Sequence, residues 1–304
     1  MKFLQYAAAI ASAASVEYAP TEYPLHEINL DLPPEERFVE IGSTYSKEIV
    51  ATMQALEKKF DPLLNIAYGI FDATGWAWKV TQTEKFKEVE GLVKGVNDPY
   101  LTQPRAIALN SFYEFGAWCT SIIAQQTDGT VIHSRNLDYL VHDNMEPMTY
   151  RAVYTRNGKP HFDAVMFAGV VGIYTGMKPD GFSISQNTRE FTKDPIYLLE
   201  NLVMLFSGYN EQSWLIRETL DTCDDWNCAH AKLRDTPVDS LGYFIVAGTK
   251  QDEGVVIARN NLGVAHETFL NSTAGTWFIV QTNNDHWVGP DGCHDRCAAA
   301  TKNL

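Results

Sequence analysis

The segment FYEFGAWCTSIIAQQTDGTVIHSRNLDY, residues 112–139, contains the pattern that decides the fold. Two runs rich in apolar and β-branched residues, CTSIIAQQ and TVIHSRNLDY, flank the dipeptide Asp128-Gly129. Asp-Gly between two such runs is a strong signal for a β-hairpin with a two-residue turn. We therefore predict two antiparallel strands, with Cys119 at the start of the first.

The same hairpin predicts a partner for Cys119. A two-residue turn at Asp128-Gly129 places Cys119 directly opposite Asp138. Arg135 lies three residues before Asp138 and would point to the other face of a regular strand, so a site that uses both requires a bulge or a strand end. The alternative for this Arg and Asp is a solvated ion pair.

The first twenty residues, MKFLQYAAAIASAASVEYAP, are typical of a secretory signal peptide that ends at about residue 15. The alternative is a buried N-terminal helix. No later segment has the roughly 18 consecutive apolar residues of a membrane span. We therefore expect a protein of the secretory route, lysosomal or extracellular.

Charge and cysteine content narrow the function further. The net charge of −14 argues against a nucleic-acid partner, which would require clustered Lys and Arg. Cys223 and Cys228 are close in sequence, as are Cys293 and Cys297; these four can pair in three ways, which leaves the thiol of Cys119. That thiol is either a nucleophile or a small buried apolar group. The Cys and His spacings match no metal site, so we expect neither a metal nor another cofactor.

The rest of the chain alternates between helical and strand patterns. Helical periodicity covers residues 34–60 and 62–92, and a loop rich in Gly, Asn and Pro follows at 95–104. Further strands are predicted at 161–176, 181–186, 240–249, 254–260 and 275–283, and helices at 195–206 and 211–221. This order indicates an α+β layered fold.

Several of these segments resemble one known family. They are CTSI at 119–122, RNLDY at 135–139, FAGVVG at 167–172, EGVVIARN at 253–260 and TNNDHW at 282–287, together with NLDLPPEER at 29–37. The chain thereby resembles the acid ceramidase and N-acylethanolamine acid amidase family of N-terminal nucleophile hydrolases. The resemblance implies a four-layer αββα sandwich. It also implies self-cleavage between Trp118 and Cys119, which gives a largely helical N-terminal α chain, residues 16–118, and a catalytic β chain, residues 119–304, that stay associated.

The resemblance also implies roles for individual residues. Cys119 would attack an amide carbonyl to form a thioester, and its newly freed α-amine would serve as the base. Asp138 would hold that amine, and Arg135 would stabilise a thiolate. Asn283 would donate to the oxyanion, and Arg296 occupies a second basic position of the family. On the residues alone, Asn283 could equally cap a strand and Arg296 could form a surface salt bridge.

The chain departs from the family pattern at two places. Asn187-Thr188-Arg189 stands where the family often has Asn-Glu-Arg, so the backbone N–H of Thr188 remains an oxyanion donor while any role of a Glu carboxylate is in doubt. The chain also ends eight residues after Arg296, earlier than the resemblance leads us to expect, so it would be a fragment or isoform, or would lack the last strands.

The function implied by the resemblance is hydrolysis of a fatty-acyl amide, with N-acylethanolamines favoured over ceramide. A lipid amide substrate implies contact with a membrane or lipid-micelle surface. Asn271-Ser272-Thr273 is an N-glycosylation sequon, as suits a lumenal protein. A small-molecule amidase of the bile-salt hydrolase type and an inactive, unprocessed lipid-binding protein are the alternatives.

Overall fold

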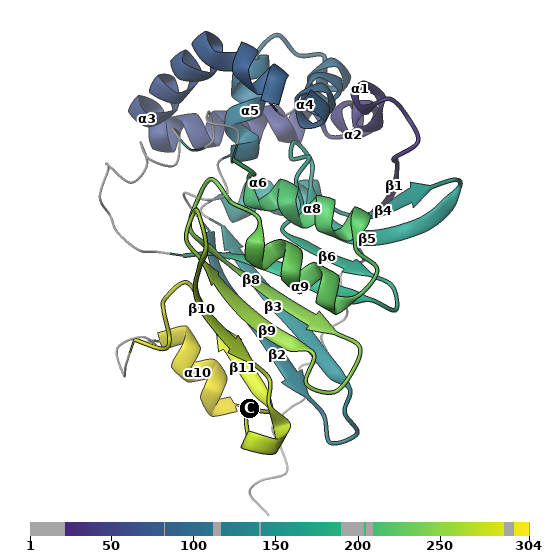
Figure 1. Ribbon diagram of the computed structural model, residues 1–304. Coiled ribbons are helices and arrows are strands. Elements are labelled where there is room, and N and C mark those ends of the chain that lie inside the picture. Colours follow the sequence, from purple (N-terminus) through teal and green to yellow (C-terminus); the bar gives the residue numbers. More distant parts are fainter. Residues whose placement is uncertain are drawn as a thin grey trace, which may run out of the picture.

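The computed structural model describes residues 22–81, 83–111, 117–139, 141–189, 204, 209–288 and 295–303. In this part of the chain, two β-sheets are packed face to face, and helices cover both outer faces (Figure 1). A separate group of helices from the N-terminal third lies at one end of the sheets.

The larger sheet has eight strands in the order β1-β4-β5-β6-β7-β8-β9-β10. All neighbouring pairs are antiparallel except β1–β4, which is parallel. The strands are β1 (Leu25–Asn29), β4 (Thr149–Arg156), β5 (Lys159–Phe167), β6 (Thr175–Lys178), β7 (Phe182–Thr188), β8 (Gly242–Gly248), β9 (Gly254–Arg259) and β10 (Val264–Phe269).

The centre of this sheet is buried on both faces. β8 and β9 are apolar runs, GYFIVAG and GVVIAR, apart from Arg259 at the end of β9, and nearly all of their residues are buried. Helices α8 (Gln212–Thr222) and α9 (Trp226–Asp235) cover one face, and the smaller sheet covers the other (Figure 1). A strand between two such layers needs apolar residues at every position, which explains the absence of alternation.

The smaller sheet has the order β11-β2-β3 and carries the hairpin with which the sequence analysis began. Its strands are β2 (Ala117–Gln125), β3 (Val131–Tyr139) and β11 (Phe278–Gln281), and helix α10 (Asp295–Asn303) packs against β11. The layers therefore run from α8 and α9 through the two sheets to α10. This confirms the expected α+β fold with an αββα layering.

The N-terminal helices are α1 (Pro34–Arg37), α2 (Val39–Thr44), α3 (Ser46–Thr81), α4 (Thr83–Val96) and α5 (Gln103–Ser111). They confirm the helical patterns at 34–60 and 62–92. The loop predicted at 95–104 is shorter, because α4 continues to Val96 and α5 begins at Gln103. The α3 helix is kinked at Phe60, where φ is −128° and ψ is 24°. Gly91 and Gly95 let α4 pack closely against the α1–α2 segment, because a Cβ at either position would collide with the carbonyl of Glu35 or Val39.

Two buried ion pairs join these helices to the body of the protein. Lys85 on α4 contacts Glu211, which directly precedes α8. Glu88, one turn further along α4, accepts a 2.6 Å hydrogen bond from Nη2 of Arg217 on α8 and a 2.8 Å bond from Arg37. The side chains of Lys85 and Glu88 are fully buried, so removal of one partner would leave an uncompensated charge.

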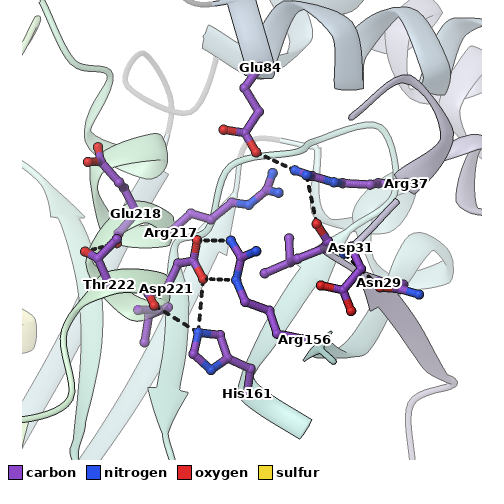
Figure 2. A network of polar contacts seen from close by, with 12 residues as sticks. Asn29, Asp31, Arg37, Glu84, Arg156, His161, Arg217, Glu218, Asp221 and Thr222 are labelled. Atoms are coloured by element: carbon purple, nitrogen blue, oxygen red, sulfur yellow. Dashed lines mark hydrogen bonds and ion pairs between the residues drawn. The ribbon is translucent and has the colours of Figure 1, made fainter. Parts of the chain in front are cut away.

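Strand β1 also joins the N-terminal segment to the body of the protein, because it pairs with β4 at the edge of the large sheet. Figure 2 shows this region, where Arg37 reaches Glu84 and Arg156 binds Asp221 through two hydrogen bonds of 2.7 and 2.5 Å. His161 contacts the same carboxylate at 3.0 Å. Burial alone would raise the pKa of Asp221, but the bonds from Arg156 and His161 hold it below its usual value.

The remaining differences from the sequence analysis are local. The predicted strand at 161–176 is two strands, β5 and β6, because the chain turns at Gly169, whose φ is +98°. Strands β4 and β10 and helices α5, α9 and α10 were not predicted. The helix predicted at 195–206 falls outside the described residues except for residue 204. Helix α6 (His142–Met145) and two short 3-10 turns, Glu146–Met148 and Ser272–Ala274, complete the described elements.

Candidate active site

Cys119 lies in β2 and is fully buried between the two sheets. Its neighbours include the buried side chains of Val170 and Tyr174 and the half-buried Leu137 and Phe167. Its backbone N–H donates a 2.9 Å hydrogen bond to Oδ1 of Asn283. Residues 117 and 118 continue the same strand, so both sides of the Trp118–Cys119 peptide bond are extended and paired with β3.

The register of the hairpin corrects one prediction. Cys119 pairs with Leu137, and Asp138 pairs with Trp118 instead. The connection has three residues rather than two: Gln126 N–H bonds to Thr130 O at 2.8 Å, and Gly129 adopts a left-handed φ of +89°. A left-handed glycine at the end of a three-residue loop is a standard hairpin closure, and it shifts every pair by one residue.

This shift places Arg135 on the face that carries Cys119. Leu137 pairs with Cys119, and Arg135 is two residues before Leu137, so their side chains share a face. No bulge is required. Nη2 of Arg135 lies 3.3 Å from Sγ of Cys119 and donates a 2.7 Å bond to the carbonyl of Gln186. Nη1 donates to the carbonyl of Tyr174 at 3.2 Å. Carbonyls of the large sheet therefore fix the guanidinium plane beside the sulfur.

Asn283 and Arg296 meet at the backbone of Cys119. Nη2 of Arg296 donates to Oδ1 of Asn283 at 2.8 Å, and Nη1 donates to the carbonyl of Cys119 at 2.9 Å. Nδ2 of Asn283 donates a 2.6 Å bond to the carbonyl of Thr188. Asn283 follows β11 and Arg296 is on α10, so two elements converge on the predicted nucleophile.

Asp138 contacts this group through Arg296. Its Oδ2 lies 3.8 Å from Nη1 of Arg296, and about half of its side chain is exposed. Since Asp138 pairs with Trp118, it lies beside the peptide bond that precedes Cys119 rather than opposite the thiol. The six predicted residues Cys119, Arg135, Asp138, Thr188, Asn283 and Arg296 thus lie in one region, with Asp138 at its exposed edge. Asn271 is exposed at the far end of β10, where its side chain caps a 3-10 turn.

Sequence reasoning missed an ion pair that braces this region. Arg189 donates two hydrogen bonds to Asp285, at 2.7 and 2.6 Å, and Tyr243 donates a third at 2.5 Å. Burial alone would raise the pKa of Asp285, but these bonds hold it below its usual value. Arg189 follows Thr188 and Asp285 lies two residues after Asn283, so the only sequence signal was adjacency to two predicted residues.

His133 also lies between the sheets, two residues before Arg135. Its ring nitrogens lie 2.9 Å from the hydroxyls of Ser183 and Ser185. Burial, and next the positive charge of Arg135, lower the pKa of His133 to about 4. In the part of the chain that the structure describes, no cluster of His, Cys, Asp and Glu could hold a metal ion.

The cysteines divide as the sequence analysis allowed. Cys223 and Cys228 form a disulfide, which selects the local pairing for these two, and Cys119 keeps its thiol. Cys297 is also in a disulfide, whereas Cys293 lies outside the described residues. No helix among the described ranges is both long enough and apolar enough to cross a membrane.

A buried cysteine at the start of an interior strand, between two sheets and beside an arginine and an asparagine, defines a class. These features fit the class of N-terminal nucleophile hydrolases. Comparison with known proteins narrows the class. N-acylethanolamine-hydrolyzing acid amidase of Rattus norvegicus is 34% identical over 295 residues, which cover 94% of this chain and 77% of that protein. Acid ceramidase of Mus musculus is 30% identical over 309 residues, 92% of this chain and 75% of that protein.

The chain therefore belongs to the N-acylethanolamine acid amidase and acid ceramidase family. A solved structure of the Caenorhabditis elegans ortholog of N-acylethanolamine-hydrolyzing acid amidase superposes with a TM-score of 0.57 at 35% identity and covers 61% of this chain and 78% of that one. A family model described as the beta subunit of N-acylethanolamine-hydrolyzing acid amidase matches residues 21–75. This match lies N-terminal to Cys119, so the subunit that the model calls beta corresponds to the segment called the α chain above.

Proposed function

We propose that this protein is an amidase that hydrolyses N-acylethanolamines to a fatty acid and ethanolamine after it cleaves itself at the Trp118–Cys119 bond. The observation that carries the proposal is the position of Cys119. Its sulfur is beside the fixed charge of Arg135, and its backbone nitrogen bonds to Asn283. One residue thus combines a stabilised nucleophile with a nitrogen that is already held in place.

Self-cleavage uses the thiol of Cys119 first. Sγ attacks the carbonyl carbon of Trp118, the C–N bond breaks, and the acyl group of the N-terminal segment is transferred to sulfur while the nitrogen becomes an amine. Water then hydrolyses this thioester, which leaves a carboxylate on Trp118 and restores the thiol. Asp138, which pairs with Trp118, is the proposed partner of the new amine.

Amide hydrolysis then repeats the same chemistry on a substrate. Sγ attacks the substrate carbonyl, the α-amine accepts the thiol proton, and the amine delivers it to the departing ethanolamine nitrogen. The side-chain amide of Asn283 and the backbone N–H of Thr188 are the proposed donors to the oxyanion. Loss of one such donor typically lowers the rate about 100- to 1000-fold. Water hydrolyses the acyl-thioester and releases the fatty acid.

The acyl group and the compartment are proposed on separate grounds. The relatives named as acid amidases and acid ceramidases support a lysosomal setting, and the Cys223–Cys228 disulfide suits an oxidising, secretory-route compartment. The signal peptide expected at 1–15 lies outside the described residues. Contact with a lipid surface is proposed because the substrate is a lipid, and N-glycosylation is proposed at the exposed Asn271.

The proposal is tested by incubating the purified protein near pH 4.5 beside a Cys119→Ala variant. Intact mass and N-terminal sequencing should find a new chain that begins CTSII in the parent only. The cleaved protein should then release fatty acid from a long-chain N-acylethanolamine faster than from an N-acylsphingosine. Faster release from the N-acylsphingosine would assign the ceramidase reaction instead. An uncut parent chain would contradict the proposal and favour the non-catalytic lipid-binding alternative.

A further inference from the structure

A line of polar side chains runs between the two sheets behind the candidate active site. It is buried at Ser121, Ser185 and Asn187 and half-buried at His133 and Ser183. Ser183 Oγ lies 2.9 Å from Nδ1 of His133, and Nε2 of His133 lies 2.9 Å from Oγ of Ser185. Ser185 Oγ lies 2.9 Å from Oγ of Ser121, which donates a 2.8 Å bond to Oδ1 of Asn187. Ser121, Ser185 and Asn187 are each at most 1% exposed.

The far end of this line fixes the orientation of Asn187. One end of its amide lies 2.8 Å from the carbonyl of Gln281 and 3.2 Å from the carbonyl of Thr282. Carbonyl oxygens only accept hydrogen bonds, so the atom that faces them is Nδ2. The other end is therefore Oδ1, which only accepts, and the hydroxyl proton of Ser121 is committed to it.

The direction of every other bond then follows. Because the proton of Ser121 points at Asn187, Ser185 donates to Ser121. Because the proton of Ser185 is committed in turn, Nε2 of His133 carries a hydrogen and donates to Ser185. Nδ1 of neutral His133 is then an acceptor and receives the hydroxyl proton of Ser183. The lowered pKa of His133 agrees with a neutral ring.

Asn187 stands where three parts of the active site meet. Thr282, whose carbonyl it binds, directly precedes Asn283. Thr188, whose carbonyl accepts from Nδ2 of Asn283, directly follows Asn187. Ser121, which orients the amide, is two residues after Cys119 and on the same face of β2. The side chain of Asn187, on β7, therefore forms hydrogen bonds to residues of both β2 and β11.

We propose that Asn187 is a positioning residue, oriented by the chain of donors from His133 through Ser185 and Ser121, and that it sets Asn283 against the backbone nitrogen of Cys119. Asn187 does not touch the reacting atoms in this assignment. It acts on the strand end that carries Asn283, and Ser121 prevents its amide from rotating. The kinetic part of the proposal rests on the proposed function, since it takes Asn283 as a donor in the reaction.

The direction of the chain is measured by NMR on the intact, uncleaved Cys119→Ala protein labelled with nitrogen-15 at histidine. The His133 signals, assigned by their loss in a His133→Gln variant, should show a hydrogen on Nε2 and none on Nδ1 at pH 6. A hydrogen on Nδ1 would reverse the chain and overturn the proposal. This readout requires no substrate and no turnover.

The kinetic consequence is measured with Ser121→Ala, and the matched control is Ser134→Ala, which removes an exposed hydroxyl from the opposite face of β3. Ser121→Ala should lower kcat roughly 10- to 100-fold, because small displacements of catalytic groups cost that much, and should leave KM within about twofold. The rate of self-cleavage should fall as well. Ser185→Ala, which leaves the Ser121–Asn187 bond intact, should have a smaller effect.

The two parts of the test separate the possible failures. Equal kcat and equal cleavage rates in Ser121→Ala and Ser134→Ala would overturn the positioning role. If the parent hydrolyses no N-acylethanolamine while the His133 tautomer is as stated and Ser121→Ala slows cleavage, the proposed substrate is wrong and the positioning role stands. If Ser121→Ala does not fold, the proposal is tested by the His133 tautomer and by the cleavage rate of Ser185→Ala. A hydrogen on Nδ1, or a cleavage rate equal to that of Ser134→Ala, would overturn it.

Discussion

Nη2 of Arg135 lies 3.3 Å from the sulfur of Cys119, although 16 positions separate the two residues in the chain. The hairpin register brings them together, and the carbonyls of Gln186 and Tyr174 hold the guanidinium in place. A planar cation with several donors can contact the sulfur and both carbonyls at once. A fixed positive charge at this distance is suited to the negative charge that develops on an attacking thiol.

The first prediction concerns that contact. Arg135→Lys keeps the charge but cannot bridge sulfur and carbonyls together, so we expect self-cleavage and turnover to fall about 10-fold or more, and about 100- to 1000-fold in Arg135→Gln. Cleavage is followed by intact mass and turnover by fatty-acid release. Arg151→Lys, at an exposed position on β4, is the control and should behave as the parent does. A fully active Arg135→Gln protein would exclude the proposed role.

The second prediction concerns the Arg189–Asp285 ion pair. Asp285→Asn leaves the nearly buried guanidinium of Arg189 without its countercharge, and breaking such a pair costs about 3–5 kcal/mol. We expect a lower free energy of unfolding in urea, together with lower activity because Asn283 is two residues away.

Tyr243→Phe refines that experiment, since it removes only the hydroxyl that bonds to Asp285 and should cost about 1 kcal/mol. Its matched control is Tyr150→Phe, because the buried hydroxyl of Tyr150 has no hydrogen-bond partner among the residues that the structure describes, and its loss should be neutral or stabilising. Equal destabilisation by both tyrosine substitutions would contradict the assigned role of Tyr243.

The third prediction concerns how the two chains stay together after cleavage at Trp118–Cys119. Strand β1, the Lys85–Glu211 pair and the Glu88–Arg217 pair all join the N-terminal segment to the body. We expect the cleaved chains to elute together in gel filtration. Glu88→Gln should lower the free energy of unfolding by about 3–5 kcal/mol, because it leaves Arg217 buried without a countercharge.

Glu90→Gln is the control for that substitution, since Glu90 lies on the exposed face of the same helix. Surface changes of this kind usually alter stability by less than about 0.5 kcal/mol. Chains that separate in the cleaved parent protein would show that these contacts do not suffice to hold them.

The fourth prediction is a pH dependence of stability. Asp239 is buried, and this burial raises its pKa to about 7 despite the opposing charge of Lys85. An unfolded Asp titrates at about pH 3.9, so between these values the folded protein binds a proton that the unfolded chain lacks. The contribution to stability is fully present below about pH 4 and is lost as the pH rises through 7.

We therefore expect a higher melting temperature near pH 5 than near pH 7.5, and a smaller difference in Asp239→Asn. Asp180→Asn, at an exposed position, should keep the pH dependence of the parent. An Asp239→Asn protein with an unchanged pH profile would show that another group is responsible. A stability that is higher at low pH suits a protein that works in an acidic compartment.

The sequence predicted the elements better than it predicted their ends. Helices α3, α4 and α8 and strands β7, β8 and β9 follow from period and composition, because their apolar residues are set by the layer that each must cover. The Asp128-Gly129 turn was read one residue too short, since Thr127-Asp128-Gly129 and a two-residue Asp-Gly turn are equally compatible with the flanking runs. That single residue decided which face of β3 carries Arg135.

By itself, the sequence determined the layered α+β fold, the thiol of Cys119 and, through its resemblance to a family, the residues gathered around it. Period and composition are local properties of a segment, so they predict its structure without knowledge of the rest of the chain. Only the tertiary structure decided the hairpin register, the Arg189–Asp285 pair and the directed chain that ends on Asn187. The ion pair and the directed chain join segments far apart in sequence, and hydrogen-bond geometry between distant residues is fixed only when the two sheets pack. The hairpin register depends on the length of a turn for which the flanking runs allow two or three residues.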